Sequence, residues 1–202
     1  MKVLLVNGSP HRDGCTNEAL TIISEELAKY DIDTEKIWIR NRQVRGCVAC
    51  EKCLEDGLCN FTDDCTNDIK KALLECDGII VGSPVYFAGP NGALCAILDR
   101  VFYHDLGKFA NKPGAGIVSC RRSGSTASFD RLNKYFTIRN MPIVPSQYWN
   151  AVHGNTPEEV RQDKEGIQTM RTLARNMAWM LNAFDKVEKP EHEKEVRTNF
   201  IR

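Results

Sequence analysis

The feature that most constrains this chain is a repeated alternation of short apolar runs with segments of helical periodicity. The runs read as strands at 3–6, 33–40, 78–83, 114–119 and 141–144. Between and after them, apolar residues recur every three or four positions, which predicts helices from Thr16, at 69–76, 94–101 and 129–136, and finally over 167–184. This alternation predicts an α/β fold with an open, mostly parallel sheet and helices on both faces.

The chain has 202 residues, which fits a single domain. Lys and Arg number 27 and so do Asp and Glu, so the net charge of zero argues against a nucleic-acid partner. No apolar run approaches the roughly 18 residues of a membrane helix, and the N-terminus does not read as a signal peptide. We therefore expect a cytoplasmic protein without a membrane partner. In that reducing compartment, the nine cysteines indicate metal or redox chemistry more than disulfides.

Ligands of such sheets bind beyond the carboxyl ends of the strands. The turn over 8–17, after the first strand, combines glycines, hydroxyls and a following helix N-terminus, which suits a phosphate. An ordinary turn capped near Thr16 is the alternative. Cys15 stands where a Walker loop has lysine, and Gly-x-Gly-x-x-Gly is absent from the turn. A phosphate monoester such as that of FMN remains.

Two further turns follow the strands at 78–83 and 114–119. The first carries Tyr86 and Phe87 among prolines and glycines, which favours a flat ligand, although aromatic residues are usually core. The second carries Arg121 and Arg122 beside hydroxyls and Gly124. These arginines are either plain surface charge or donors to an anion or a ring carbonyl.

Several motifs together resemble the NADPH-dependent FMN reductase family. They are Gly8-Ser9-Pro10 with Gly14-Cys15-Thr16, Gly82 to Phe87, Leu98-Asp99-Arg100, Arg121 to Gly124, and Gln147 to Asn150 with Val152-His153-Gly154. The resemblance implies a flavodoxin-like three-layer sandwich with five parallel strands in the order 2-1-3-4-5. It covers residues 1–184, predicted as one FMN-binding domain, with 41–66 as a cysteine-rich insert after the second strand and 185–202 as a charged tail.

Site residues follow from this resemblance position by position. Those implied around the FMN phosphate are Ser9, His11, Arg12, Gly14, Cys15, Thr16 and Asn17. The implied neighbours of the flavin ring are Pro84, Val85, Tyr86 and Phe87 on one side, and Ser119, Arg121, Arg122 and Gly124 on the other. His11 stands where relatives often have arginine, and a neutral imidazole would bring less charge to the phosphate.

Five cysteines lie in the insert 41–66, and four of them fall within thirteen positions: Cys47, Cys50, Cys53 and Cys59. The compact spacing is typical of ligands to a 4Fe-4S cluster, and the region resembles the iron–sulfur flavoprotein branch of the family. Structural zinc and unligated thiols are the alternatives, and Cys65 is a possible substitute ligand. The remaining cysteines are expected to be small buried residues: Cys15, Cys76, Cys95 and Cys120.

These observations predict an FMN-dependent NAD(P)H oxidoreductase that passes electrons to a flavin, a quinone or another small acceptor. FMN carries the chemistry, so no catalytic side chain is required. The alternatives are an iron–sulfur flavoprotein that carries electrons between redox partner proteins, and a zinc-stapled binding module without flavin. The exposed aromatic loops favour a homodimer or a tetramer of dimers, with the cluster near the flavin across the interface.

Overall fold

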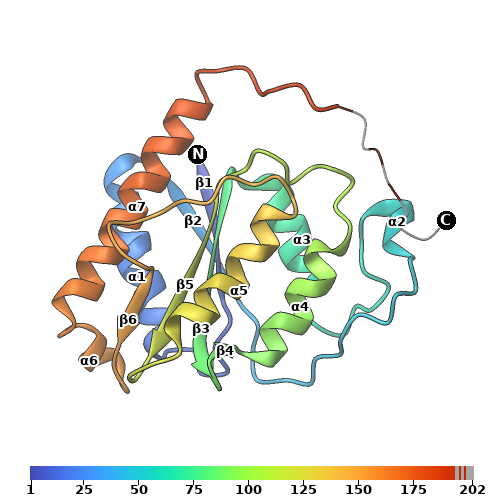
Figure 1. Ribbon diagram of the computed structural model, residues 1–202. Coiled ribbons are helices and arrows are strands. Elements are labelled where there is room, and N and C mark those ends of the chain that lie inside the picture. The colour runs from blue at the N-terminus through green and yellow to red at the C-terminus, as the bar shows by residue number, and fades with distance from the viewer. Residues whose placement is uncertain (194–195, 197, 199–202) are drawn as a thin grey trace.

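The computed structural model describes residues 1–193, 196 and 198. Its centre is a parallel sheet in the order β2-β1-β3-β5-β6 (Figure 1). The strands are β1 (Lys2–Asn7), β2 (Asp33–Trp38), β3 (Gly78–Tyr86), β5 (Gly114–Cys120) and β6 (Ala151–His153). The two-residue β4 (Gly89–Pro90) pairs antiparallel with the end of β3. The five parallel strands confirm the predicted flavodoxin-like order.

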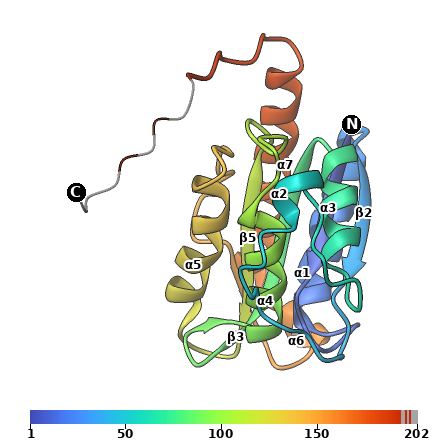
Figure 2. The ribbon, with the colours of Figure 1, turned by 90° about the vertical axis from the view of Figure 1, so that its right-hand side faces the viewer.

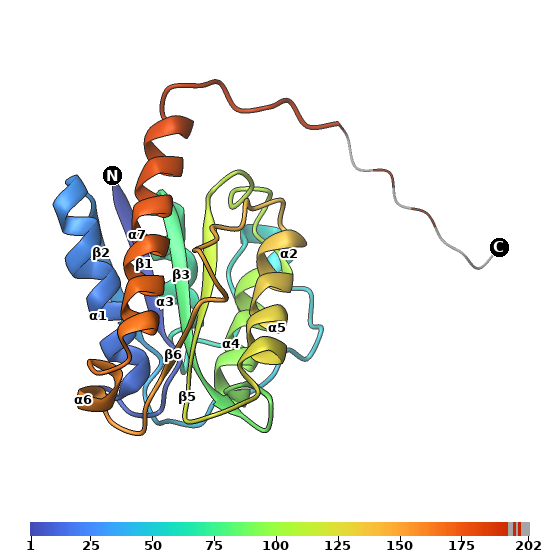
Figure 3. The ribbon, with the colours of Figure 1, turned by 60° about the vertical axis from the view of Figure 1, so that its left-hand side comes forward.

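Helices cover both faces of the sheet (Figure 3). One face carries α1 (Cys15–Leu27) and α7 (Lys164–Phe184), and the other carries α3 (Thr66–Glu75), α4 (Gly92–Tyr103) and α5 (Ser125–Thr137). Three short helices lie outside these layers: η1 (Ala28–Tyr30), α2 (Cys53–Asp56) and α6 (Pro157–Val160). The strand β1 is buried on both faces, with Leu5 in the α1/α7 core and Leu4 in the α3/α4/α5 core. Alternate side chains of a strand point to opposite faces, so one apolar run serves both cores.

The predicted fifth strand was wrong in position. Residues 141–144 make only a single bridge, between Ile143 and Gly114, and the strand forms later as β6. Pro142 and Pro145 flank the bridge and have no backbone N–H to donate, which explains why a ladder does not extend there. The buried side chains of Met141 and Val144 gave the segment its strand-like apolar pattern.

Two other boundaries differ from the expectation. The strand β2 ends at Trp38 rather than at Arg40, which has a positive φ of 67°. The strand β3 continues past Ser83 to Tyr86, because its end pairs with β4. Residues 84–86, predicted as a loop, therefore form the outer end of a strand.

The C-terminal segment follows α7, which ends at Phe184 (Figure 1). Residues 185–193 carry neither helix nor strand, and 194, 195, 197 and 199–202 of the predicted tail lie outside the described residues. Among the helices that the structure describes, none is both long and apolar enough to cross a membrane.

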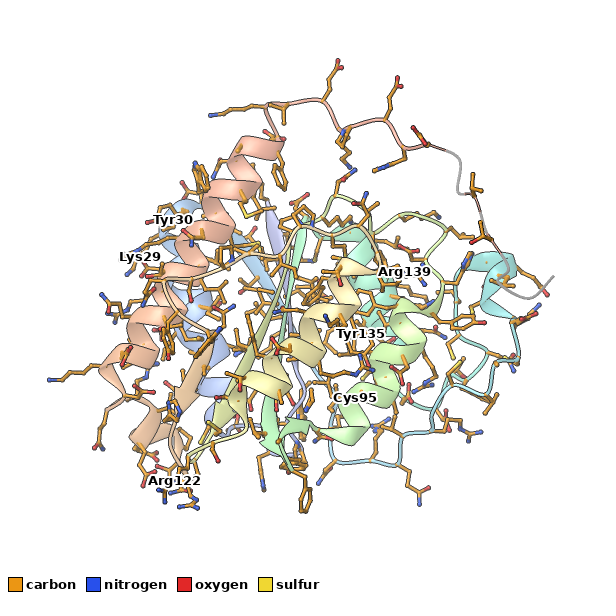
Figure 4. All side chains as sticks on the ribbon, in the orientation of Figure 1. Lys29, Tyr30, Cys95, Arg122, Tyr135 and Arg139 are labelled. Atoms are coloured by element: carbon orange, nitrogen blue, oxygen red, sulfur yellow. The ribbon has the colours of Figure 1, made fainter. Side chains whose placement is uncertain are left out.

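Glu26 joins the two helices on one face of the sheet, and this contact predicts a pH effect. Its buried carboxylate accepts hydrogen bonds from Lys29 at 2.6 Å and from Arg175 of α7 at 2.7 Å (Figure 4 labels Lys29). Burial raises the pKa of Glu26, but these hydrogen bonds outweigh burial and the net pKa is lowered. The stabilisation is therefore present above the unfolded-state pKa of about 4.3 and is lost as pH falls through the lower folded-state pKa.

We expect Glu26→Gln to lower the free energy of unfolding at pH 7 by about 1–3 kcal/mol, since a charged hydrogen-bond acceptor is lost. The free energy of unfolding of the variant should also fall less than that of the wild type as pH drops below about 4.3. Urea unfolding between neutral and acidic pH measures both effects. Glu25→Gln is the matched control, because Glu25 is exposed and, among the described residues, pairs only with the half-exposed Arg161. Equal losses in the two variants would contradict the role given to Glu26.

Candidate functional site

The turn after β1 lies against the end of β3, at the edge where the parallel strands end. The amide of Gly8 donates a hydrogen bond to the carbonyl oxygen of Gly82 at 2.8 Å. A Cβ atom at Gly8 would lie 2.6 Å from that same oxygen. Glycine at this position therefore allows the close approach that places the turn over the sheet.

Asn7 and Trp38 hold this turn in place, and neither was predicted from the sequence as a site residue. Asn7 Oδ1 accepts from the amide of Ser9 at 3.0 Å, and its Nδ2 donates to the carbonyl of Arg12 at 3.0 Å. Trp38 Nε1 donates to the Ser9 carbonyl at 2.7 Å. The hydroxyl of Ser9 accepts from the amide of His11 at 3.1 Å, so it is part of the turn's own framework. The sequence signal that could have revealed Asn7 is its position directly after the apolar run 3–6.

The turn leads directly into the N-terminus of α1. Gly14 is the N-cap, and it makes no side-chain capping bond within the described part of the chain. The first amides of a helix have no partners inside the helix, so those of Cys15, Thr16 and Asn17 are available to an anion. Exposed His11 and Arg12 precede them in the turn. The arrangement suits a phosphate at this position.

The side chains of these three helix residues are engaged elsewhere. The Thr16 hydroxyl and the Ser119 hydroxyl are hydrogen-bonded at 2.9 Å, both buried, which ties α1 to the end of β5. Asn17 Oδ1 accepts from Lys36 at 3.0 Å. The Cys15 thiol donates to the carbonyl of Gly154 at 3.5 Å, and burial raises its pKa. In this arrangement the three residues offer their backbone amides to an anion, while their side chains bond to other parts of the protein.

The two predicted ring-flanking loops touch one another. Gly124, with φ of 87°, lies so close to the β3 loop that an added Cβ would stand 3.0 Å from Val85 Cγ1 and from Ala88 Cα. Phe87 is fully exposed and Tyr86 is nearly half exposed, so neither is a core residue. Arg122 lies at the same end of the molecule as the carboxyl ends of the strands (Figure 4). The loops thus present aromatic rings and guanidinium groups around one edge of the sheet.

A second aromatic pair follows on the segment before β6. Tyr148 and Trp149 are both more than half exposed, and their ring centroids lie 4.8 Å apart. Asn150 is buried and donates to the carbonyl of Gly116 at 3.1 Å, while its Oδ1 has no partner among the described residues. Trp149 comes two residues before Ala151, which pairs with Val118 of β5, so these rings lie along the β6 side of the sheet rather than beyond the carboxyl ends of its strands.

Gly8→Ala tests the close approach of the first turn. We expect a loss of about 1–3 kcal/mol in the free energy of unfolding, typical of overpacking, and weaker flavin binding because the turn must shift. Gly92→Ala is the control, since a Cβ there meets no atom within 4 Å. Thermal unfolding and a fluorescence titration with FMN measure the two effects. Wild-type flavin affinity in Gly8→Ala would contradict this account of the turn.

The four clustered cysteines of the insert line one small cavity of about 20 Å³, together with Arg100 and Tyr103 of α4. The backbone around it takes left-handed conformations at Ala49 (φ 51°), Glu51 (φ 58°) and Gly57 (φ 81°). Residues with a positive φ bend the chain sharply. Where such residues alternate with right-handed ones, successive backbone amides point to the same side and attract negative charge. The insert therefore curls around the thiols.

Among the described residues, no three Cys, His, Asp or Glu side chains are arranged to hold one metal ion. The prediction was that four cysteines bind one metal: Cys47, Cys50, Cys53 and Cys59. In the structure they line one cavity, but their side chains are not arranged as ligands of one ion. All nine cysteines lie in the described part, and none forms a disulfide. Cys47 and Cys50 are exposed, on a segment without regular structure. The donor set suits a thiolate-ligated metal group, and metal ligation commonly supplies the free energy that orders such a loop.

The other five cysteines match the expected burial and roles only in part. Cys65 is the N-cap of α3 and lines a groove beside β2, outside the four-cysteine cavity, so it is not placed as a substitute ligand. Burial raises the pKa of Cys65 to about 11. Cys76 and Cys120 are buried as predicted, whereas Cys15 and Cys95 are only half buried.

Comparison with known proteins now decides the family. The sequence model of the NADPH-dependent FMN reductase family matches residues 1–156, which contain every strand and both parts of the candidate site. The chain belongs to this family. An iron–sulfur flavoprotein of Methanocaldococcus jannaschii is 32% identical over 198 residues, spanning 92% of this chain and 100% of the relative. The chain therefore groups with the iron–sulfur flavoprotein branch.

Solved structures agree with this family on the fold. RosB, solved with bound 8-demethyl-8-formylriboflavin-5'-phosphate, has a TM-score of 0.75 at 12% identity and covers 100% of this chain and 92% of its own. A flavodoxin from the Archaea has a TM-score of 0.61 at 15% identity, covering 90% of this chain and 99% of its own. Family membership supports FMN binding by this chain and a role as a flavin oxidoreductase or electron carrier.

Proposed function

We propose that this member of the FMN reductase family is an NAD(P)H oxidoreductase that passes electrons to a flavin, a quinone or another small acceptor, using FMN and a 4Fe-4S cluster. The observation that carries the proposal is the presence, in one chain, of an uncapped helix N-terminus behind a phosphate-type turn and of four cysteines around one cavity. Neither feature alone would indicate both cofactors.

In this proposal, the amides at the start of α1 and the side chain of Arg12 hold the FMN phosphate. The loops over 84–87 and 119–124 enclose the ring. Bound FMN supplies hydride and single-electron chemistry, so the chain needs no acid or base of its own. Arg121 and Arg122 would donate to ring carbonyls and stabilise the charge that the ring gains on reduction.

Cys47, Cys50, Cys53 and Cys59 would hold the cluster, which when bound supplies single-electron transfer. Zinc held by the same thiolates is the competing occupant, because four thiolates also suit that ion. The compact spacing of the first three cysteines and the iron–sulfur names of the relatives favour iron.

The position of the cysteines in the fold favours an oligomer. α2, which begins at Cys53, lies towards the opposite end of the molecule from the outer end of β3 in two perpendicular views (Figures 1 and 2). A second copy is therefore the proposed route by which a cluster comes near a flavin. The exposed rings of Tyr86, Phe87 and Trp149 supply apolar surface for such an interface. Sedimentation should report a dimer or a tetramer, and a monomer at micromolar concentration would contradict this part.

A second candidate is an electron carrier that receives its electrons from a partner protein. The net charge of zero favours the enzyme, because small carriers commonly rely on strong charge to steer association. Anaerobic absorbance separates the two. NADPH or NADH should bleach the flavin band of the enzyme, and a flavin band that neither nucleotide bleaches would support the carrier. A colourless protein that takes up no FMN would overturn both.

A further inference from the structure

The side chain of Arg100, from the motif Leu98-Asp99-Arg100, contacts the cysteine-rich insert rather than the loops at the carboxyl ends of the strands. Its guanidinium pairs with the carboxylate of Asp64, and both side chains are only 1% exposed. Asp64 Oδ1 also accepts from the amide of Thr66 at the start of α3, at 2.9 Å. The pair therefore anchors the end of the insert to α4 in the interior.

Arg100 has a second contact, with one of the four cysteines. Its Nη1 donates towards Cys59 Sγ at 3.8 Å. Cys59 is held in place by Asn67 of α3, whose side chain accepts from the Cys59 amide at 2.8 Å and donates to its carbonyl at 2.9 Å. The backbone of this cysteine is thus fixed, with a cation facing its sulfur.

Lys70 of α3 is a second buried cation, and it contacts the backbone of the cysteine-rich insert. Its side chain is almost completely buried, and its ammonium donates to the carbonyls of Gly57 and of His104, the latter at 2.8 Å. Gly57 lies between Cys53 and Cys59 in the chain. Burial lowers the pKa of Lys70, and a negative charge on Cys53, Cys59 or Asp105 would act against this lowering.

The charges in this interior do not balance without the thiols. Asp64 offsets Arg100 and Asp105 pairs with Arg139 at 3.7 Å, whereas Lys70 makes no ion pair with any residue that the structure describes. A buried cation is costly unless a negative group compensates it. Four thiolates around an iron–sulfur core carry net negative charge, and they would lie next to this unbalanced ammonium.

We propose that Lys70 and Arg100 form the positive complement of the cysteine-bound cluster and set its reduction potential. The inference rests on the proposed function. Arg100 acts by donating to the Cys59 sulfur, and Lys70 acts through its charge and by holding the Gly57 carbonyl. Both are positioning residues, since neither needs to exchange electrons or protons. Reduction by one electron adds negative charge to the cluster, so a nearby cation favours the reduced state.

The test is a redox titration of anaerobically purified full-length protein, with dithionite as the reductant and the cluster followed by electron paramagnetic resonance. We expect Lys70→Met to reduce the equilibrium constant for cluster reduction about tenfold, which for a one-electron couple is a potential lower by about 59 mV. Lys71→Met is the matched control, because Lys71 is the next residue and is exposed. Its potential should equal that of the wild type.

Lys70→Gln separates charge from hydrogen bonding, because glutamine keeps an N–H donor and loses the charge. It should lower the potential in the same direction, and it provides the measurement if Lys70→Met does not fold. FMN content checks the fold of each variant, since the phosphate turn lies outside α3. Iron-loaded Lys70→Met and Lys70→Gln with wild-type potentials would overturn the inference and leave the proposed function intact. A wild-type protein without iron would overturn the proposed cluster and this inference together.

Discussion

Replacing Cys50 by serine is expected to remove most of the iron from anaerobically purified protein while leaving FMN bound. Cys50 lines the shared cavity and is exposed, so its loss removes a ligand without disturbing the buried cores. The turn over 8–17, where we propose that the FMN phosphate binds, follows β1 at the end of the molecule away from α2 (Figure 2). The two cofactors should therefore be lost independently. Iron, acid-labile sulfide and FMN are each measured per chain.

Cys65→Ser is the matched control for this experiment. Cys65 belongs to the same insert but lines a different groove, so its replacement should leave the iron content unchanged. Equal iron in Cys50→Ser and wild type would exclude Cys50 as a ligand. Iron lost from Cys65→Ser as readily as from Cys50→Ser would show that the insert rearranges more than the shared cavity suggests.

Asp64→Asn is expected to be the most destabilising single exchange of a charged residue in the insert. It leaves the guanidinium of Arg100 buried without its counterion, and breaking a buried pair in this way typically costs about 3–5 kcal/mol. Burial raises the pKa of Asp64, but hydrogen bonds from Arg100 and Thr66 outweigh it, so the net pKa is lowered. The stabilisation is hence present at neutral pH and is lost as pH falls through the folded-state pKa.

Urea unfolding at neutral pH measures this loss, and Asp63→Asn provides its control. Asp63 pairs with Arg45, but both side chains are more than half exposed, so the change should stay within about 0.5 kcal/mol. A double variant that replaces both partners by apolar residues, Asp64→Leu with Arg100→Met, should recover much of the stability, because no charge is left unpaired. Equal unfolding curves for Asp64→Asn and Asp63→Asn would contradict the buried pair.

Most strands could be predicted from the sequence because three of them are continuous apolar runs, whereas the strand order came from the family resemblance. The run at 78–83, for example, is buried throughout and lies at the centre of the sheet. The fifth strand could not be placed, because Met141 and Val144 are as buried as strand residues although prolines prevent a ladder there. Burial and backbone pairing are separate properties, and an apolar pattern reports only the first.

Two glycines of the candidate site could be predicted from the sequence, whereas the side chains that support the site could not. Gly8 and Gly124 mark close approaches that only a small residue allows, and both lie in predicted motifs. Trp38 and Lys70 reach the site from β2 and α3, distant in sequence, through hydrogen bonds to backbone carbonyls. Such contacts leave no periodicity or motif, so only the folded chain reveals them.

Cofactor analysis of the anaerobically purified wild-type protein shows whether one chain holds both FMN and an iron–sulfur cluster. The released flavin is identified by chromatography, and FMN, iron and sulfide are measured per chain on the same sample. We expect stoichiometric FMN together with iron and sulfide in equal amounts, and a flavin band that NADPH or NADH bleaches. A protein that holds zinc or no metal, and that takes up no FMN when FMN is added, would contradict it.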